Sequence, residues 1–217
     1  MIASDHELRG LLDSGELVLD PREDALLQPS SVDLRLGRCV RRLQGGSEVL
    51  DLAEDLDEVE VYADQEIPAE GVILDAGEAL LGQTLERMTL PATFQGVIEQ
   101  RSSLIRLGVQ VTSSVVNPGY VGNLPLLIVN LSRRPIRLHS GMPVCQLVLH
   151  GLTSRPGLTY PEKPGAKYQG ERTITASRVA EDIRRWSRPP SLTLADPSQA
   201  SSFRKEAIFE DDGDEIL

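Results

Sequence analysis

The chain has 217 residues, of which 40% are hydrophobic and 25% are charged, and its formal net charge is −11. This length and composition suit one domain with a sizeable core and an additional terminal segment. The negative charge argues against nucleic-acid binding, no run approaches the roughly 18 apolar residues of a membrane helix, and the first residues do not resemble a signal peptide. We therefore expect a cytoplasmic protein without nucleic-acid or membrane partners.

The first predicted element is a short helix over residues 4–12. Ser4 and Glu7 have the spacing of a capping box, in which each side chain satisfies a backbone N–H group of the other residue. The apolar stripe of this helix consists of Leu8, Leu11 and Leu12. We expect the stripe to pack on the core.

Short stretches of alternating polar and apolar residues, separated by glycine and proline, then recur along the chain. Residues 71–84 are predicted to form a strand, a reversal at Asp75–Gly77 and a second strand. Other strand-like stretches are SSVDLRLG, FQGVIEQ, GVQVTSS, LPLLIVNLS, RPIRLHSG and VCQLVLHGL. This spacing is typical of a mainly β fold, a jelly roll or β-barrel, rather than of alternating strands and helices.

The C-terminal part is predicted to contain one amphipathic helix over residues 177–186. After it the composition changes, because residues 188–217 are rich in proline and serine and end in a run of acids. Such a composition is typical of a mobile tail. We therefore predict one domain over residues 1–187 and an acidic C-terminal extension over residues 188–217.

The charge is unevenly distributed. Residues 48–70 contain ten acids and no lysine or arginine, which is typical of a solvated face. Residues 101–178 contain ten lysines or arginines against two acids, and they coincide with Ser-rich and Gly-rich clusters. This second segment would suit a small polyanion such as a triphosphate.

Several common chemistries have no motif in this chain. The zinc deaminase signature H-x-E with P-C-x-x-C is absent, and the three histidines do not cluster with cysteines, so we expect no zinc. A P-loop, a dinucleotide-binding glycine motif and a G-x-S-x-G elbow are also absent. Cys39 and Cys145 are far apart in sequence, and we expect both to be reduced and structural.

Four separated motifs nevertheless occur in an order that resembles the dCTP deaminase family, in the superfamily shared with trimeric dUTPases. They are QPSSVDLRLG, RSSLIRLG, NPGYVGN and GAKYQGERTITASR, and the similarity covers roughly residues 1–180. The resemblance implies a distorted jelly roll of the dUTPase type with short N- and C-terminal helices. It also implies a homotrimer with active sites between subunits, which bind a pyrimidine deoxynucleoside triphosphate with Mg²⁺ on its phosphates.

The RSSLIRLG motif supplies the first group of candidate residues. A guanidinium, two hydroxyls and exposed backbone N–H groups can hold phosphate oxygens through charge-assisted hydrogen bonds. By resemblance, Arg101 and Ser103 are phosphate ligands. Ser102 and Arg106 match the positions at the reacting base, where they can orient a water or stabilise developing charge. An ordinary Ser-rich surface turn is the alternative interpretation.

The hairpin and a C-terminal lid supply the second group. The hairpin VTSSVVNPGYVGN, with Ser113 in it, resembles the loop that reads the pyrimidine through backbone groups, and Tyr120 matches the ring under the deoxyribose. A tyrosine that simply packs on the core is the alternative. Tyr160, Lys167 and Tyr168 match lid residues that close over the triphosphate, so we predict a lid over residues 160–178.

The chain departs from the family pattern where the catalytic acid should stand. In dCTP deaminases a glutamate lies five residues beyond the second glycine of the hairpin motif and carries protons. Here that residue is Leu127, which cannot transfer a proton. A dUTPase would instead use an aspartate at the position of Asn117, whose amide can orient a water but cannot accept its proton. Gln100, Glu171 and Val115 also differ from the usual residues.

Four hypotheses follow from these departures. The first is an enzyme that deaminates dCTP to dUTP or dUMP with Ser102 and Arg106 at the base. The second is a dUTPase-like pyrophosphatase that uses Asn117 and Mg²⁺-polarised water. The third is a catalytically silent nucleotide-binding trimer that acts as a sensor or regulator. The fourth is a pocket refitted for a different nucleotide, which Leu127 and Val115 would make more apolar.

Overall fold

Strands dominate the computed structural model, which describes residues 1–46, 49–55 and 61–186. The helical elements are α1 (Asp5–Ser14), the 3-10 turn η1 (Asp24–Leu26), α2 (Ser102–Ile105) and α3 (Val179–Trp186). The strands are β1 (Val18–Asp20), β2 (Leu27–Gln28), β3 (Ser31–Leu43), β4 (Tyr62–Glu66), β5 (Val72–Leu74), β6 (Ala79–Thr84), β7 (Arg87–Thr89), β8 (Phe94–Gln100), β9 (Val109–Thr112), β10 (Val121–Gly122), β11 (Pro125–Asn130), β12 (Ile136–Leu138) and β13 (Pro143–Gly151).

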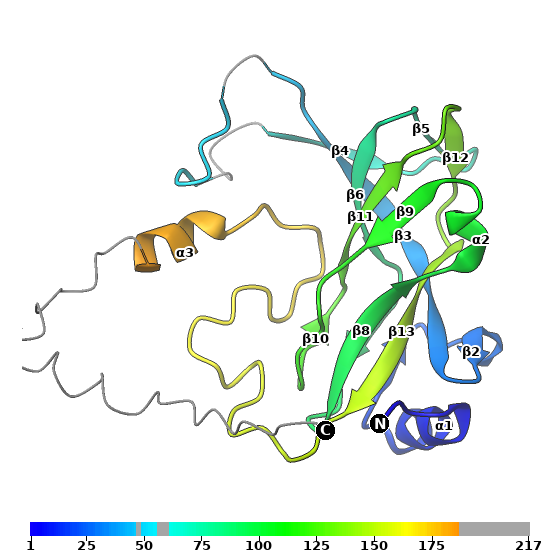
Figure 1. Cartoon of the computed structure of the whole chain (residues 1–217), viewed down its shortest axis with the longest axis vertical. Coiled ribbons are helices and arrows are strands. Elements are labelled where there is room, and N and C mark those ends of the chain that lie inside the picture. The colour runs from blue at the N-terminus through cyan, green and yellow to red at the C-terminus, as the bar shows by residue number, and fades with distance from the viewer. Residues whose placement is uncertain (47–48, 56–60, 187–217) are drawn as a thin grey trace, which may run out of the picture.

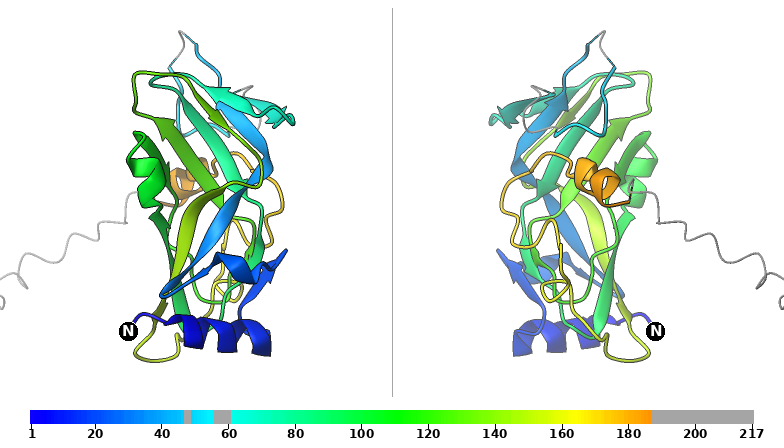
Figure 2. Two further views of the ribbon diagram at one scale, coloured as in Figure 1. Left: turned by 90° about the vertical axis from the view of Figure 1, so that its right-hand side faces the viewer. Right: turned by 90° about the vertical axis from the view of Figure 1, so that its left-hand side faces the viewer.

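The strands form a near-closed barrel (Figure 1). The largest sheet has the order β8-β13-β3-β6-β11-β9, and β2 and β4 also pair with β3. Gly96 of β8 and Val116 form an isolated bridge that links β8 to the chain following β9. Strands β1, β7 and β10 form a second small sheet, and β5 pairs with β12. Figure 2 shows the barrel from two sides, with α1 across its lower end.

Strand β11 illustrates how the sequence pattern produces the core. Successive side chains of a strand point to opposite faces, so alternate residues share an environment. Leu126 and Ile128 are completely buried, whereas Leu127 between them is 44% exposed. Strand β11 pairs without interruption from Pro125, opposite Gln83, to Val129, opposite Ala79. Pro125 therefore introduces no bulge, and Leu127 stays in the register expected from the sequence.

The N-terminal helix confirms the Ser4 half of the predicted capping box. Ser4 is the N-cap of α1, and its side chain accepts a hydrogen bond from the backbone N–H of Glu7 at 3.5 Å. The helix ends two residues later than predicted, at Ser14, because Gly15 with φ of 76° adopts the left-handed conformation that glycine tolerates best. In the described part of the chain no helix is long and apolar enough to cross a membrane.

The predicted strand, reversal and second strand over residues 71–84 are confirmed, but the two strands do not pair with each other. Strands β5 and β6 both form, but β5 pairs with β12 while β6 pairs with β3 and β11. The intervening residues 75–77 therefore turn the chain from one sheet to another. Local turn chemistry identified the turn, but the long-range partners of each strand decide the pairing.

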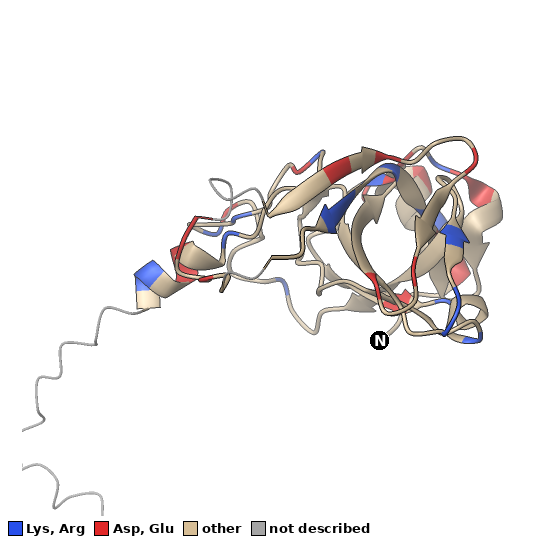
Figure 3. Ribbon diagram, turned by 90° about the horizontal axis from the view of Figure 1, so that it is seen from above, with Lys and Arg blue, Asp and Glu red and all other residues tan. Residues whose placement is uncertain are grey.

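The C-terminal helix α3 begins two residues later than predicted, at Val179. Its first turn carries Glu181 and Asp182 and its last turn carries Arg184 and Arg185, a distribution that complements the helix dipole and is visible in Figure 3. The predicted extension over residues 188–217 and its boundary at residue 187 lie outside the described residues.

The two cysteines provide a simple test of this fold. Cys145 on β13 is completely buried, and burial raises the pKa of its thiol to about 12, whereas Cys39 on β3 is exposed. Because the thiolate is the reactive form, a disulfide reagent at pH 8 should modify one thiol per native chain and two per denatured chain. Rapid modification of both native thiols would contradict the packing of β13.

Candidate functional site

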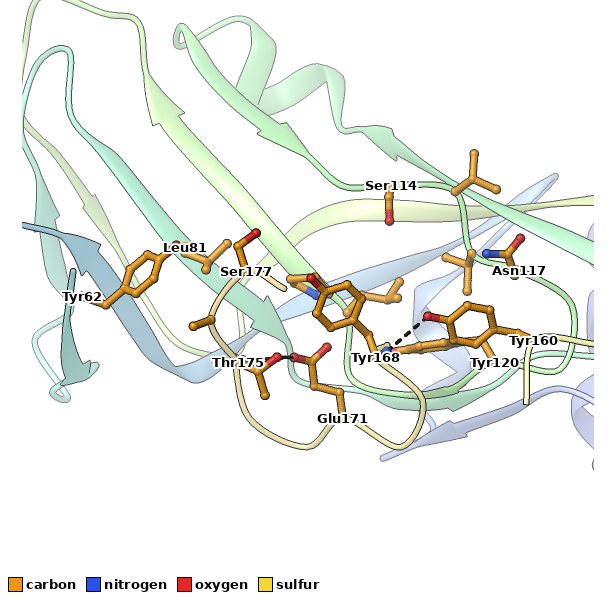
Figure 4. Close-up of a pocket in the computed structure, with 15 residues that line it drawn as sticks. Tyr62, Leu81, Ser114, Asn117, Tyr120, Tyr160, Tyr168, Glu171, Thr175 and Ser177 are labelled. Atoms are coloured by element: carbon orange, nitrogen blue, oxygen red, sulfur yellow. Dashed lines mark hydrogen bonds between the residues drawn. The ribbon is translucent and has the colours of Figure 1, made fainter. Parts of the chain in front are cut away.

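A cavity of about 560 Å³ lies between residues 114–125, which overlap the predicted hairpin of residues 111–123, and residues 160–177 of the segment predicted as the lid. We call it the hairpin–lid pocket. Its wall is largely apolar and aromatic, and Figure 4 shows side chains from both segments around it. Apolar walls with a few fixed polar groups are typical of small-molecule sites.

Backbone hydrogen bonds attach the lid to the hairpin. The N–H of Tyr160 donates to the carbonyl of Pro118 at 2.8 Å, and that of Gly170 donates to Val121 at 2.7 Å. In the opposite direction, the N–H of Asn123 donates to the carbonyl of Glu171 at 2.8 Å. The lid is thus held in place along both ends of the hairpin motif.

Three tyrosines form the aromatic end of the pocket. The hydroxyl of Tyr120, which is 5% exposed, donates to the carbonyl of Asn123 at 2.7 Å. Its ring lies 6.0 Å from that of Tyr160 at a tilt of 50°, an arrangement favourable for aromatic pairs. The Tyr160 hydroxyl accepts a hydrogen bond from the N–H of Tyr168 at 3.2 Å. Burial and the nearby charge of Glu171 raise the pKa of Tyr120, so it remains a neutral packing surface.

Glu171 is the one charged residue among the described residues that line the pocket. One carboxylate oxygen, Oε1, accepts hydrogen bonds from the backbone N–H of Thr175 at 3.0 Å and from the Thr175 hydroxyl. The other oxygen, Oε2, is buried and has no hydrogen-bond partner among the described residues. Figure 4 shows this carboxylate beside Thr175 and Tyr168.

A second cavity, of about 420 Å³, contains the serine and arginine cluster. Arg101, Ser102 and Ser103 at the start of α2 line it together with the buried Asp33. Nη2 of Arg101 lies 3.1 Å from Oδ2 of Asp33. Burial raises the pKa of Asp33, and the charge of Arg101 opposes that shift. The pair therefore fixes the guanidinium at the edge of a polar cavity.

The predicted site residues thus fall into three groups. Asn117, Tyr120, Tyr160 and Tyr168 line the hairpin–lid pocket, and Arg101, Ser102 and Ser103 line the second cavity. In Figure 1 the lid lies on one side of the barrel and α2 on the other. A single chain therefore does not bring the two groups into one cavity.

The remaining predicted residues, Arg106, Ser113 and Lys167, line neither cavity. The Ser113 hydroxyl donates to the carbonyl of Pro125 at 2.8 Å, so it supports the hairpin. Lys167 forms an ion pair with Asp182 of α3. Arg106 is exposed at the C-terminal end of α2.

Leu127 does not itself line the hairpin–lid pocket, but it neighbours a residue that does. It lies directly opposite Leu81 of β6, and Leu81 lines the pocket. Cross-strand partners share a face of the sheet, so Leu127 and Leu81 point to the same side. Of the described residues that line this pocket, Glu171 alone could carry a proton as a carboxylic acid.

Several lining residues were not anticipated from the sequence, namely Tyr62, Leu81, Thr175 and Ser177. Tyr62 and Leu81 belong to β4 and β6, which are far from the hairpin in sequence and carry no motif. Thr175 and Ser177 lie within the lid motif, a few residues after Glu171. This short distance in sequence was the one signal that they belong to the same site as Glu171.

Comparison with protein families places residues 2–152 in a model described as dCTP deaminase-like. A protein of Mycobacterium sp. (strain KMS) named "dCTP deaminase, dUMP-forming" is 41% identical over 187 residues, which cover 84% of this chain and 98% of the relative. The protein of the same name from Mycobacterium tuberculosis (strain ATCC 25177 / H37Ra) is 38% identical over 188 residues, with 84% and 98% covered.

Among solved structures, a 2'-deoxycytidine 5'-triphosphate deaminase from Agrobacterium tumefaciens superposes with a TM-score of 0.56 and 23% sequence identity. The match covers 68% of this chain and 46% of that chain. At this identity the likeness concerns the fold.

Proposed function

Because the chain belongs to the dCTP deaminase-like family, we propose that it binds a pyrimidine deoxynucleoside triphosphate in the hairpin–lid pocket and deaminates dCTP slowly. The observation that carries the proposal is the attachment of the lid to the hairpin around Tyr120, Tyr160 and Asn117. The resulting pocket offers aromatic surface for a nucleoside and backbone groups for the edge of a base. Mg²⁺ enters with the phosphates of the substrate.

The reaction is hydrolytic. Water attacks C4 of the cytosine ring, a C–O bond forms and the bond from C4 to the exocyclic nitrogen breaks. One proton of the water goes to the amino group, which leaves as ammonia, and the other goes to N3 of the ring. An acid or base normally carries those protons. Leu127 cannot do so, and for this reason we propose a slow reaction that yields dUTP, or dUMP and pyrophosphate where a second water also cleaves the bond between the α- and β-phosphates.

We further propose that the functional unit is a homotrimer. The phosphate-binding residues suggested by the sequence, Arg101 and Ser103, face a cavity other than the hairpin–lid pocket. A neighbouring copy could bring its own α2 to this pocket. Three exposed apolar side chains near α2 support this proposal, namely Ile105, Leu107 and Leu131. The backbone N–H of Leu131 donates to the carbonyl of Gly108, which follows α2 and Leu107 in the chain.

A second candidate function is nucleotide binding without turnover, as in a sensor or regulatory subunit. Leu127 favours it, because no carboxylate comes from β11. Asn117 argues against dUTPase-like hydrolysis, since an amide cannot accept a proton from the attacking water. Deamination releases ammonia, dUTPase-like hydrolysis releases pyrophosphate, and nucleotide binding without turnover releases neither.

The test incubates the purified protein and Mg²⁺ with dCTP, dUTP, CTP and UTP while ammonia and pyrophosphate are measured. Melting temperatures are recorded with each nucleotide, because a ligand that binds only the folded state raises them. We expect dCTP to raise the melting temperature and to release ammonia slowly. A shift without ammonia would support the silent nucleotide-binding protein, and no shift with any nucleotide would contradict both.

A further inference from the structure

The C-terminal part of the lid is attached to the barrel through polar contacts to its backbone. Nη1 of Arg41 on β3 donates to the carbonyl of Ile174 at 3.1 Å. Nε2 of Gln83 on β6 donates to the carbonyl of Arg172 at 3.3 Å. The two barrel side chains also line a cavity of about 220 Å³ together with Thr173 and Ile174. Because this cavity removes apolar contacts beneath the lid, the polar contacts carry more of its attachment.

Strand pairing explains how Arg41 reaches the lid and a wall of the hairpin–lid pocket at once. Arg41 lies directly opposite Asp64 of β4, and Tyr62, two residues before Asp64, shares that face. Nε of Arg41 pairs with Oδ1 of Asp64 at 2.5 Å. The guanidinium carbon lies 4.9 Å from the centroid of the Tyr62 ring, a favourable distance for a cation over an aromatic face. Tyr62 lines the pocket, and so does Thr175, the residue after Ile174.

We propose that Arg41 is a positioning residue, which holds the lid and the Tyr62 ring in the arrangement that forms the hairpin–lid pocket. Arg41 does not line this pocket, so its effect passes through Ile174 and Tyr62. An arginine suits this role because its planar guanidinium offers donors in several directions from one rigid group. The inference rests on the proposed function, because its effect on affinity requires a nucleotide in the pocket.

Arg42 provides a matched control on the same strand. Successive side chains of a strand point to opposite faces, so Arg42 points away from the face that carries Arg41. Its guanidinium forms an ion pair with Glu78 and donates to the carbonyl of Ile73, which are the same kinds of contact that Arg41 makes. Both partners lie outside the lid. Arg42→Ala therefore removes a comparable set of bonds without loosening the lid.

Trypsin cleavage of the full-length protein after Arg172, followed by mass spectrometry without nucleotide, measures how often the lid leaves the barrel. When opening and closing are fast relative to cleavage, the cleavage rate follows the open population. Arg41→Ala removes a hydrogen bond from a charged, partly exposed group. We expect its lid to be cleaved about 5- to 20-fold faster than that of wild type. Arg42→Ala should be cleaved at the wild-type rate.

Titration calorimetry with dCTP and Mg²⁺ measures the consequence for the site. The apparent affinity falls with the fraction of molecules that are competent to bind, so Arg41→Ala should bind dCTP about 3- to 10-fold more weakly than wild type. Arg42→Ala should bind it equally well. Ammonia release at saturating dCTP should keep the wild-type rate, because Arg41 lies outside the pocket. Arg41→Lys should fall between wild type and Arg41→Ala, since an ammonium keeps the charge but lacks the fork of donors.

Two results would overturn the inference. Wild-type cleavage and wild-type affinity in Arg41→Ala would show that other contacts position the lid. Equal losses in Arg41→Ala and Arg42→Ala would show a general effect on the barrel. Both leave the proposed function intact when wild type binds dCTP. Failure of wild type to bind dCTP would refute the proposed function instead, and the cleavage rates, which need no nucleotide, would still decide whether Arg41 holds the lid.

Discussion

Replacement of Leu127 by glutamate should increase ammonia release from dCTP by about 10²–10⁴-fold, the usual contribution of a positioned general acid or base. Leu127 is 44% exposed and lies opposite the pocket-lining Leu81, so a carboxylate there would lie on the same face of the sheet as Leu81. Because the position is partly exposed, glutamate is accommodated without creating a buried charge. The measurement is the steady-state rate of ammonia release at saturating dCTP.

Leu152→Glu is the matched control for this prediction. Leu152 follows β13 directly and is 37% exposed, so the same substitution there adds the same charge outside the pocket. Its rate should equal that of wild type. If Leu127→Glu binds dCTP, shown by a melting shift, yet its rate does not rise, the chain lacks more of the deaminase machinery than one proton carrier.

The second large effect concerns stability, and we expect Glu86→Ala to lower the free energy of unfolding by about 3–5 kcal/mol. The side chain of Glu86 is 2% exposed, and its Oε1 lies 2.6 Å from Nε of Arg35, which is 19% exposed. Oε2 also accepts the backbone N–H of Arg35 at 2.9 Å. The substitution leaves a largely buried guanidinium and a backbone donor on β3 without their partner.

Asp64→Ala supplies the comparison, because Asp64 pairs with Arg41 at 2.5 Å but is 72% exposed. An exposed ion pair contributes about 0–1 kcal/mol, so this variant should unfold at nearly the wild-type denaturant concentration. Urea titrations of all three proteins at one protein concentration provide the values. Equal losses in both variants would mean that burial does not govern the Arg35–Glu86 pair.

The sequence predicted those features that depend on short-range patterns. The strand-like stretch LPLLIVNLS was sufficient to locate β11, and the hairpin and lid motifs were sufficient to identify Tyr120, Tyr160 and Tyr168 as pocket residues. The mainly β fold also followed from the spacing of strands and turns. In each case the information lies within a few neighbouring residues.

Features that depend on contacts between distant segments could not be predicted in this way. Strand β6 contributes Leu81 to the pocket because it lies between β3 and β11, and its partners are about 40 residues away on either side. The motif residues Arg101 and Tyr120 are close in sequence, yet they line different cavities because β9 and the hairpin carry the chain around the barrel. The number of residues between two motifs does not reveal the course of the chain between them.

The ion pair between Lys167 and Asp182 has a consequence for the order of events at the lid. Lys167, the cation that the family resemblance assigns to the triphosphate, already has an anion from its own chain. A phosphate that contacts Lys167 would lie beside the carboxylate of Asp182, which repels it, so the nucleotide and α3 compete for one ammonium group. Occupancy of the pocket would then be communicated directly to the helix that precedes residues 187–217, as an exchange of one counterion for another.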